Sequence, residues 1–256
     1  MDKDGRRGTA LVTGAARRIG RAIVHDLAAH GWAVVIHCNN SVHEAQAEAD
    51  AICASGGIAC VVQADLLDED AVAKVFREAG HRAGPVDLLV NNASVFLEDA
   101  VGSLDRDLWR RQFAINLEAP VFLAEAFADQ LPEDRTGNIV NLVDQRVYKL
   151  TPQMTSYTLA KSALWTATQT LAQALAPRIR VNGVAPGPTF ANPRDGEAGL
   201  EREASGTLLR KRIDPSEIAA AIRYLVDSPS ITGQLLTLDS GQHLAWQTPD
   251  IVEREQ

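Results

Sequence analysis

Residues 9–20 read TALVTGAARRIG, and this stretch decides the fold. The apolar run at 10–12 predicts a short strand, and the apolar residues from Ile19 onward recur at the i, i+3, i+4 spacing of a helix that stops at Gly31. The turn at 13–20 would place backbone N–H groups and the positive end of the helix dipole against a bound phosphate. The stretch therefore predicts either a dinucleotide phosphate site or an ordinary turn between a strand and a helix.

The same alternation of short apolar runs and amphipathic stretches continues along the chain. A long helix is expected at 156–176, and another begins where Asp214 can cap it and Pro215 can take the first helical position. The pattern predicts an α/β fold, a Rossmann-type doubly wound parallel sheet of about seven strands with helices on both faces. The expected strands lie at 10–12, 32–37, 58–63, 86–90, 138–142, 179–184 and 235–238.

Two kinds of region break this alternation. The segment 186–206 is rich in Pro and Gly and has few periodic apolar positions, so we interpret it as a mobile loop over a site, or else as a surface insertion. The ends of the chain are polar. We expect residues 1–8 and 248–256 to be flexible tails of one domain that spans 1–256.

The composition argues against several classes of protein. The 256 residues carry 25 Lys+Arg against 33 Asp+Glu, a net charge of −8, so neither nucleic acid nor an anionic membrane is expected as a partner. No apolar stretch approaches the roughly 18 residues of a membrane span. The three Cys lack CxxC spacing and the six His form no HExxH or HxH pattern, so no metal site is expected and a cytoplasmic location fits.

The residues after the second expected strand indicate which dinucleotide would bind. An NAD site places a carboxylate there to bind the ribose hydroxyls, but residues 37–41 read HCNNS. Arg17 and Arg18 could instead bind a 2′-phosphate, with Asn40 and Ser41 as neutral hydrogen-bond donors. We therefore expect NADPH rather than NADH, unless the two arginines only solvate the start of the helix.

Tyr157 and Lys161 lie four residues apart in the expected long helix, which places both side chains on one face. A nearby ammonium group lowers the pKa of a phenol, and a proton donor works best when its pKa approaches the working pH. The pair is therefore a candidate proton donor with the cation that tunes it. A surface amphipathic or cation–π pair would have the same spacing.

The chain resembles a short-chain dehydrogenase/reductase across residues 13–242. The resemblance rests on the order of the matching segments along the chain, which are Thr13-Gly14, Asp65-Leu66, Asn91-Asn92-Ala93, Asn116, Tyr157 with Lys161, Pro186-Gly187 and Ile231-Thr232-Gly233. The resemblance implies that Asp65 contacts adenine, that Lys161 binds the nicotinamide ribose, and that Asn116 supports a water-filled proton path. The expected cofactor-binding residues are Gly14, Arg17, Arg18, Ile19, Gly20, Asn39, Asn40, Ser41, Asp65, Leu66, Asn92, Ala93, Ser94, Tyr157, Lys161, Pro186 and Gly187.

Two departures from the pattern of that family narrow the range of expected substrates. Arg18 replaces the middle glycine of TGxxxGxG, and Asp144 stands thirteen residues before Tyr157, where most members have a catalytic Ser. Both departures are similar to the pteridine reductase branch, in which the Phe96 position stacks on the pterin and Ser94 hydrogen-bonds to cofactor or pterin. The resemblance implies the catalytic residues Asp144, Tyr157, Lys161 and Asn116, and the substrate-binding residues Ser94, Phe96, Asp144, Tyr157 and Pro188.

Three functions follow from this reading. The first is an NADPH-dependent reductase that transfers hydride to a pterin-like small molecule of the dihydropterin or dihydrofolate type; a carboxyl beside Tyr157 suits this, because the ring nitrogen must gain a proton. The second is an NADPH-dependent carbonyl or 3-oxoacyl thioester reductase in which Asp144 merely replaces a Ser. The third is a noncatalytic NADPH-sensing regulator, which the intact Tyr157 and Lys161 disfavour. The resemblance also implies a homotetramer.

Overall fold

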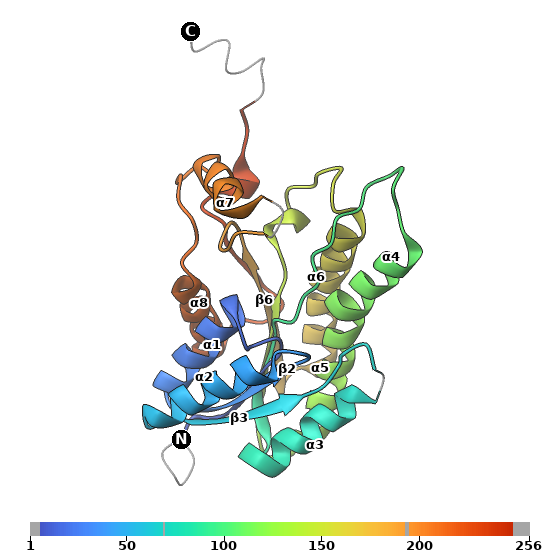
Figure 1. The fold of residues 1–256 in the computed structure, drawn as a ribbon. Helices are drawn as coiled ribbons and strands as arrows, with labels where there is room; N and C mark the ends of the chain where they lie inside the picture. The colour runs from blue at the N-terminus through green and yellow to red at the C-terminus, as the bar shows by residue number, and fades with distance from the viewer. Residues whose placement is uncertain (1–5, 69, 193–194, 248–256) are drawn as a thin grey trace.

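The computed structural model describes residues 6–68, 70–192 and 195–247. Its centre is a seven-stranded sheet in the order β3-β2-β1-β4-β5-β6-β7, with every neighbouring pair parallel (Figure 1). This arrangement confirms the expected Rossmann-type fold. The strands are β1 Gly8–Val12, β2 Trp32–Cys38, β3 Ile58–Gln63, β4 Val86–Asn91, β5 Gly137–Leu142, β6 Ile179–Pro186 and β7 Leu235–Leu238.

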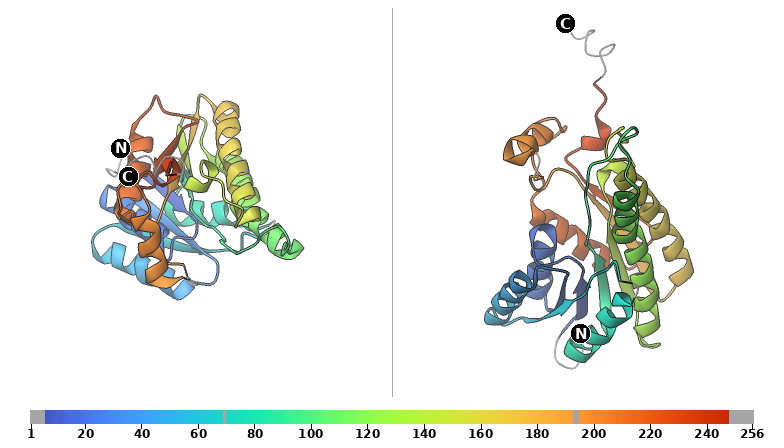
Figure 2. Two further views of the ribbon diagram at one scale, coloured as in Figure 1. Left: turned by 90° about the horizontal axis from the view of Figure 1, so that it is seen from above. Right: turned by 45° about the vertical axis from the view of Figure 1, so that its right-hand side comes forward.

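Helices cover both faces of this sheet. In the described residues they are α1 Arg18–Ala29, α2 Val42–Ala54, α3 Ala71–Ala83, α4 Arg106–Phe113, α5 Ala119–Gln130, α6 Thr155–Leu175, α7 Gly196–Ser205 and α8 Pro215–Asp227. Helices α1, α2 and α8 share one apolar core, and α3, α5 and α6 share the other (Figure 2). Successive residues of β2 alternate between the two, with Val34 and Ile36 in the first core and Val35 in the second. Burial on both faces explains why these strands read as continuous apolar runs.

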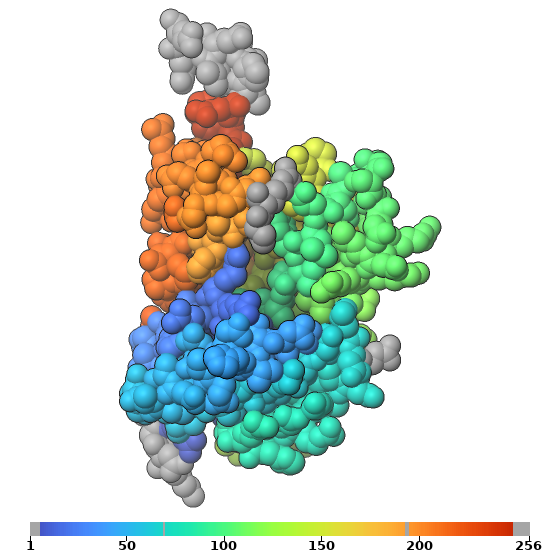
Figure 3. All heavy atoms as spheres, in the orientation of Figure 1, coloured from blue at the N-terminus to red at the C-terminus, as the bar shows by residue number. Residues whose placement is uncertain are grey.

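The strand order places a crevice at one end of the sheet. The chain leaves β1 for β2 and β3 on one side, then returns to β4 on the other side of β1. Ligands of open α/β sheets bind outside the carboxyl ends of the strands at such a switch point. In the space-filling view, the orange segment with α7 and the green segment with α4 lie on opposite sides of a hollow (Figure 3).

The expectation of a loop at 186–206 is wrong for the second half of that segment. Residues 196–205 form α7, in which Leu200 and Ala204 lie one turn apart and are buried. The glycines that suggested a loop are compatible with the helix, because Gly196 takes its positive φ of 58° at the first helical position. Residues 193 and 194 lie outside the described residues, and the mobility of the segment stays a prediction.

The expectation of a tail over residues 1–8 extends too far along the chain. Gly8 already begins β1, and the Arg7 N–H donates to the Gly31 carbonyl at 3.0 Å. The Arg7 guanidinium also forms an ion pair with Asp227 at the end of α8. Residues 1–5 and 248–256, the remainder of the expected tails, lie outside the described residues. None of the helices in the described ranges has the length and apolar character that a membrane span requires.

Candidate active site

The turn between β1 and α1 offers only part of its backbone to a ligand. Three of its N–H groups are already bonded: Thr13 donates to the Val90 carbonyl, Gly14 to the His37 ring and Ala15 to the His37 carbonyl. In contrast, the N–H groups of residues 18–20 have no backbone acceptor among the described residues, because they form the first turn of α1. The N–H groups of residues 18–20 are therefore available to a ligand, and phosphate binding at this turn stays a prediction.

Two glycines allow this turn to pack tightly against the segment after β4. Gly14 has φ +61°, and a Cβ there would lie 2.9 Å from the Ala93 Cα. Gly20 is closer still, because a Cβ would lie 2.6 Å from both the Asn92 side-chain nitrogen and the Gly14 carbonyl oxygen. Asn92 in turn donates to the carbonyls of Thr13 and Gly14 at 2.8 and 3.0 Å. The phosphate-binding turn and the β4 segment thus form one rigid unit.

Substitution of Gly20 by Ala tests this packing. The added Cβ would meet backbone and cannot be accommodated by a flexible side chain, so we expect a loss of about 1–3 kcal/mol in unfolding free energy. We also expect weaker NADPH binding. Urea unfolding and an NADPH titration measure both effects. The matched control is Gly80→Ala in α3, where a Cβ would meet nothing within 4 Å; it should instead stabilise the protein by about 0.5–1 kcal/mol, and equal behaviour of the two variants would contradict the packing argument.

Both arginines of the turn lie at the expected place, and each already has partners. Arg17 forms an ion pair with Glu44 of α2. Arg18 donates to the carbonyls of Ala191 and Phe190 at 3.1 and 3.5 Å, and its guanidinium lies 5.0 Å from the centre of the Phe190 ring. The sequence reading missed Glu44, because it examined only residues 37–41 for a carboxylate. A 2′-phosphate that binds Arg17 would therefore have to share the guanidinium with Glu44 or displace the Glu44 carboxylate from it.

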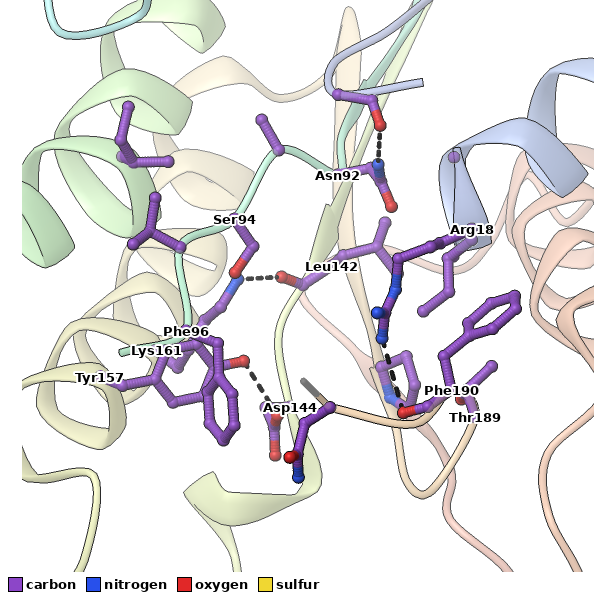
Figure 4. A pocket seen from close by; sticks show the side chains of 18 of the residues that line it. Arg18, Asn92, Ser94, Phe96, Leu142, Asp144, Tyr157, Lys161, Thr189 and Phe190 are labelled. Carbon is purple, nitrogen blue, oxygen red and sulfur yellow. Dashed lines mark hydrogen bonds between the residues drawn. The ribbon is translucent and has the colours of Figure 1, made fainter. Parts of the chain in front are cut away.

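Tyr157 and Lys161 lie on one face of α6 as expected, and both are buried. The Tyr157 hydroxyl donates to Asp144 Oδ2 at 2.9 Å, whereas Lys161 Nζ donates to the Leu142 carbonyl at 2.7 Å (Figure 4). Asp144 follows β5, and its other oxygen accepts from the Arg146 N–H at 2.8 Å. The phenol hydroxyl therefore donates to a carboxylate, while the ammonium group lies 5.8 Å from the centre of the phenol ring.

These contacts overturn the expected tuning of the phenol. Burial, followed by the charge and hydrogen bond of Asp144, raises the pKa of Tyr157 well above its usual range. Burial also lowers the pKa of Lys161 to about 8, and it raises the pKa of Asp144. The expectation that Lys161 makes the phenol acidic is thus wrong in this structure, because burial and then Asp144 raise the pKa of Tyr157. Tyr157 and Asp144 instead form a partly buried, hydrogen-bonded pair that can hold and pass a proton.

Asn116 has a different position from the other expected site residues. It is fully buried in a π-helical turn at 114–118, between α4 and α5. Its side-chain oxygen accepts from Ser94 Oγ at 2.7 Å and from the Val95 N–H at 3.2 Å, and its nitrogen donates to the Val95 carbonyl at 2.8 Å. Asn116 therefore fixes the segment that carries Ser94. Its role in a proton path stays a prediction.

Phe96 presents an accessible ring beside the Tyr157–Asp144 pair. The ring is 39% exposed and lies edge-on to Tyr157, with centroids 4.7 Å apart and planes at 81°. The Arg146 guanidinium lies 5.7 Å from the centre of the same ring. An exposed aromatic face beside a proton donor suits a flat ring that stacks on it. Sequence reasoning missed Arg146, for which only its place two residues after Asp144 was a signal.

One cavity of about 820 Å³ brings the expected site together. Every residue expected to bind cofactor or substrate lines it, including Asn39, Asp65, Leu66, Pro186, Gly187 and Pro188, and so do the catalytic candidates other than Asn116. Across the described residues, no three His, Cys, Asp or Glu side chains gather as a metal site would require.

Known sequences match most of this chain. A family model described as enoyl-(acyl carrier protein) reductase matches residues 14–243. An uncharacterized oxidoreductase of Methylorubrum extorquens is 35% identical over 240 residues, which cover 91% of this chain and 96% of that protein. A 3-oxoacyl-[acyl-carrier-protein] reductase of Synechocystis sp. is 31% identical over 236 residues, which cover 91% of this chain and 95% of that protein.

Solved structures give a stronger likeness. FolM alternative dihydrofolate reductase 1 from Brucella suis, in complex with NADP, has a TM-score of 0.93 and 56% identity, covering 95% of this chain and 98% of that one. A blue fluorescent protein from a metagenomic library, in complex with NADPH, has a TM-score of 0.85 and 33% identity, covering 93% of this chain and 98% of that one. The motifs, the fold and these matches show that the chain belongs to the short-chain dehydrogenase/reductase superfamily.

Proposed function

We propose that the protein is an NADPH-dependent reductase that transfers hydride to a pterin-like ring of the dihydropterin or dihydrofolate type. The observation that carries this proposal is the partly buried hydrogen bond between the Tyr157 hydroxyl and Asp144, beside the 39% exposed Phe96. The 56% identity to an alternative dihydrofolate reductase supports it.

The cavity fits a dinucleotide that carries an additional phosphate. The N–H groups of residues 18–20 can bind a pyrophosphate at the positive end of α1. Asn40 and Ser41 line the cavity at the end of β2 and can donate to a 2′-phosphate, next to the arginines of the turn. Solved relatives hold NADP or NADPH. When bound, NADPH would supply the hydride.

The side chains of this chain would perform the remaining chemistry. Hydride addition to the carbon of a ring C=N bond leaves the electron pair on nitrogen, which must then gain a proton. The Tyr157 hydroxyl can donate that proton, and Asp144, whose pKa is raised by burial, can pass on a replacement. A carboxylate can also accept hydrogen bonds from the amino group and ring N–H of a pterin. Phe96 would stack on the ring.

A second candidate is the reduction of a 3-oxoacyl thioester or another carbonyl compound. The relatives named as 3-oxoacyl-[acyl-carrier-protein] reductases favour it, and it would use the same cofactor residues. A ketone oxygen needs one proton donor, which Tyr157 alone would supply, so the pairing with Asp144 gives this candidate no advantage. A noncatalytic NADPH sensor is a third candidate, but it gives no reason for a phenol–carboxylate pair in the cavity.

NADPH consumption with three substrates separates these candidates. We expect turnover of dihydrobiopterin and dihydrofolate, and little turnover of an acetoacetyl thioester. Turnover of the thioester alone would reject the pterin proposal in favour of the carbonyl reductase. NADPH binding without turnover of a broad panel of pterins and carbonyl compounds would favour the sensor.

We also propose that the protein is a homotetramer in the cytoplasm with no nucleic-acid partner. Large apolar side chains are exposed on three helices, with Phe122 on α5, Leu159 on α6 and Tyr224 on α8 at 54, 47 and 56% exposure. Such side chains suit contacts between subunits. The acidic net charge of −8 opposes phosphate binding over the surface. Light scattering after size exclusion would give the mass of the assembly.

A further inference from the structure

A buried histidine connects two of the loops that line the cavity. His37 lies near the end of β2 and is only 2% exposed. Its Nδ1 accepts the Gly14 N–H at 3.2 Å, and its Nε2 lies 3.1 Å from the Ala64 carbonyl oxygen. Its own carbonyl accepts the Ala15 N–H at 2.9 Å. One residue thus holds the β1–α1 turn on one side and the connection after β3 on the other.

The contacts of His37 determine the state of its ring. The Gly14 N–H can only donate, so Nδ1 must be unprotonated, and Nε2 carries the hydrogen that it donates to the Ala64 carbonyl. Burial lowers the pKa of His37 to about 4, although the Ala64 carbonyl and the Asp65 charge raise it. The ring is therefore neutral at neutral pH, with one acceptor and one donor in use.

Both loops held by His37 contribute to the proposed cofactor site. The Gly14 turn leads directly into residues 18–20, whose N–H groups are available to a phosphate. Ala64 precedes Asp65 and Leu66, which line the same cavity. Without an acceptor at Nδ1, the Gly14 N–H would lose its partner, and the turn would have to rotate or take up a water.

We propose that His37 is a positioning residue for the dinucleotide, which holds the phosphate-binding turn and the Asp65 loop in the relative placement that NADPH needs. The inference rests on NADPH binding, as in the proposed function, but not on the identity of the substrate. His37 acts through the backbone of other residues and not on the reacting atoms.

Three substitutions separate the two ring contacts. His37→Asn retains an acceptor at the place of Nδ1, whereas His37→Gln retains a donor at the place of Nε2 and His37→Leu retains neither. We expect the Kd for NADPH to rise about 10-fold in His37→Gln and His37→Leu, and to stay within about threefold in His37→Asn. Fluorescence titration with NADPH measures this without any substrate.

The control and a second readout separate positioning from general stability. His30→Gln removes an exposed ring that lies against the carbonyl and carboxylate oxygens of Asp26, outside the cavity, and it should leave the Kd unchanged. With a substrate that is turned over, the KM for NADPH in His37→Gln should rise at least fivefold more than kcat falls. Equal Kd values in all three His37 variants, or a loss that follows only their thermal stability, would overturn the proposal. If the unsubstituted protein itself binds no NADPH, the proposed function fails instead.

Discussion

Replacement of Tyr157 by Phe is expected to lower kcat by about 10²- to 10⁴-fold, the usual contribution of a positioned general acid. The substitution removes only the hydroxyl that donates to Asp144 at 2.9 Å, and it leaves the ring that contacts Phe96. NADPH binding should therefore persist. Steady-state kcat with the pterin that is turned over, together with an NADPH titration, measures the two effects separately.

A second tyrosine provides the matched control. Tyr148 lies four residues after Asp144, is 47% exposed, and contacts the His243 ring, with centroids 5.6 Å apart. Tyr148→Phe also removes one phenolic hydroxyl, but one that has no contact with the Tyr157–Asp144 pair, so kcat should stay within about twofold. If Tyr157→Phe kept more than a third of kcat, the proton would have to come from another group.

The sheet was the part of the structure most open to prediction. Residues such as Val34, Val35 and Ile36 are fully buried because helices pack on both faces, and this produces apolar runs that are easy to locate. Helix α7 was missed for the opposite reason. Its buried side is narrow, with Leu200 and Ala204 as its buried residues, and its glycines are typical of loops.

The members of the site were predictable, whereas their pairing was not. Spacing along a helix placed Tyr157 and Lys161 on one face. It could not show that Asp144, two residues after the end of β5, lies within 2.9 Å of the phenol, because that contact depends on the packing of the segment after a strand against a helix. His37 was missed for the same reason, since its partners lie in two other loops. Contacts between segments that lie far apart in the sequence can be identified only from the three-dimensional structure.

Replacement of Asp144 by Asn is expected to lower kcat for a pterin by about 10²-fold and to change its pH dependence. The amide keeps an acceptor for the Arg146 N–H but cannot take up or release a proton. The pKa of Tyr157 is raised by burial and by the Asp144 charge and hydrogen bond. A phenol with a raised pKa stays protonated to higher pH, so removal of the charge should move the alkaline loss of activity to lower pH. A pH series of kcat measures this.

The acid side of the same profile should also change. Burial raises the pKa of Asp144, so this carboxylate gains its proton at a higher pH than an exposed Asp, and any change in kcat that this protonation causes should vanish in Asp144→Asn.

Asp214→Asn is the control: Asp214 caps α8 through the Ser216 N–H, Asn is an equally good cap, and the carboxylate lies outside the cavity. Its pH profile should match that of the unsubstituted protein. The Tyr157–Asp144 pair carries the proposed pterin chemistry. If Asp144→Asn kept kcat within threefold and changed neither the acid nor the alkaline side of the pH profile, Asp144 would be a simple replacement for Ser. That result would favour the carbonyl reductase.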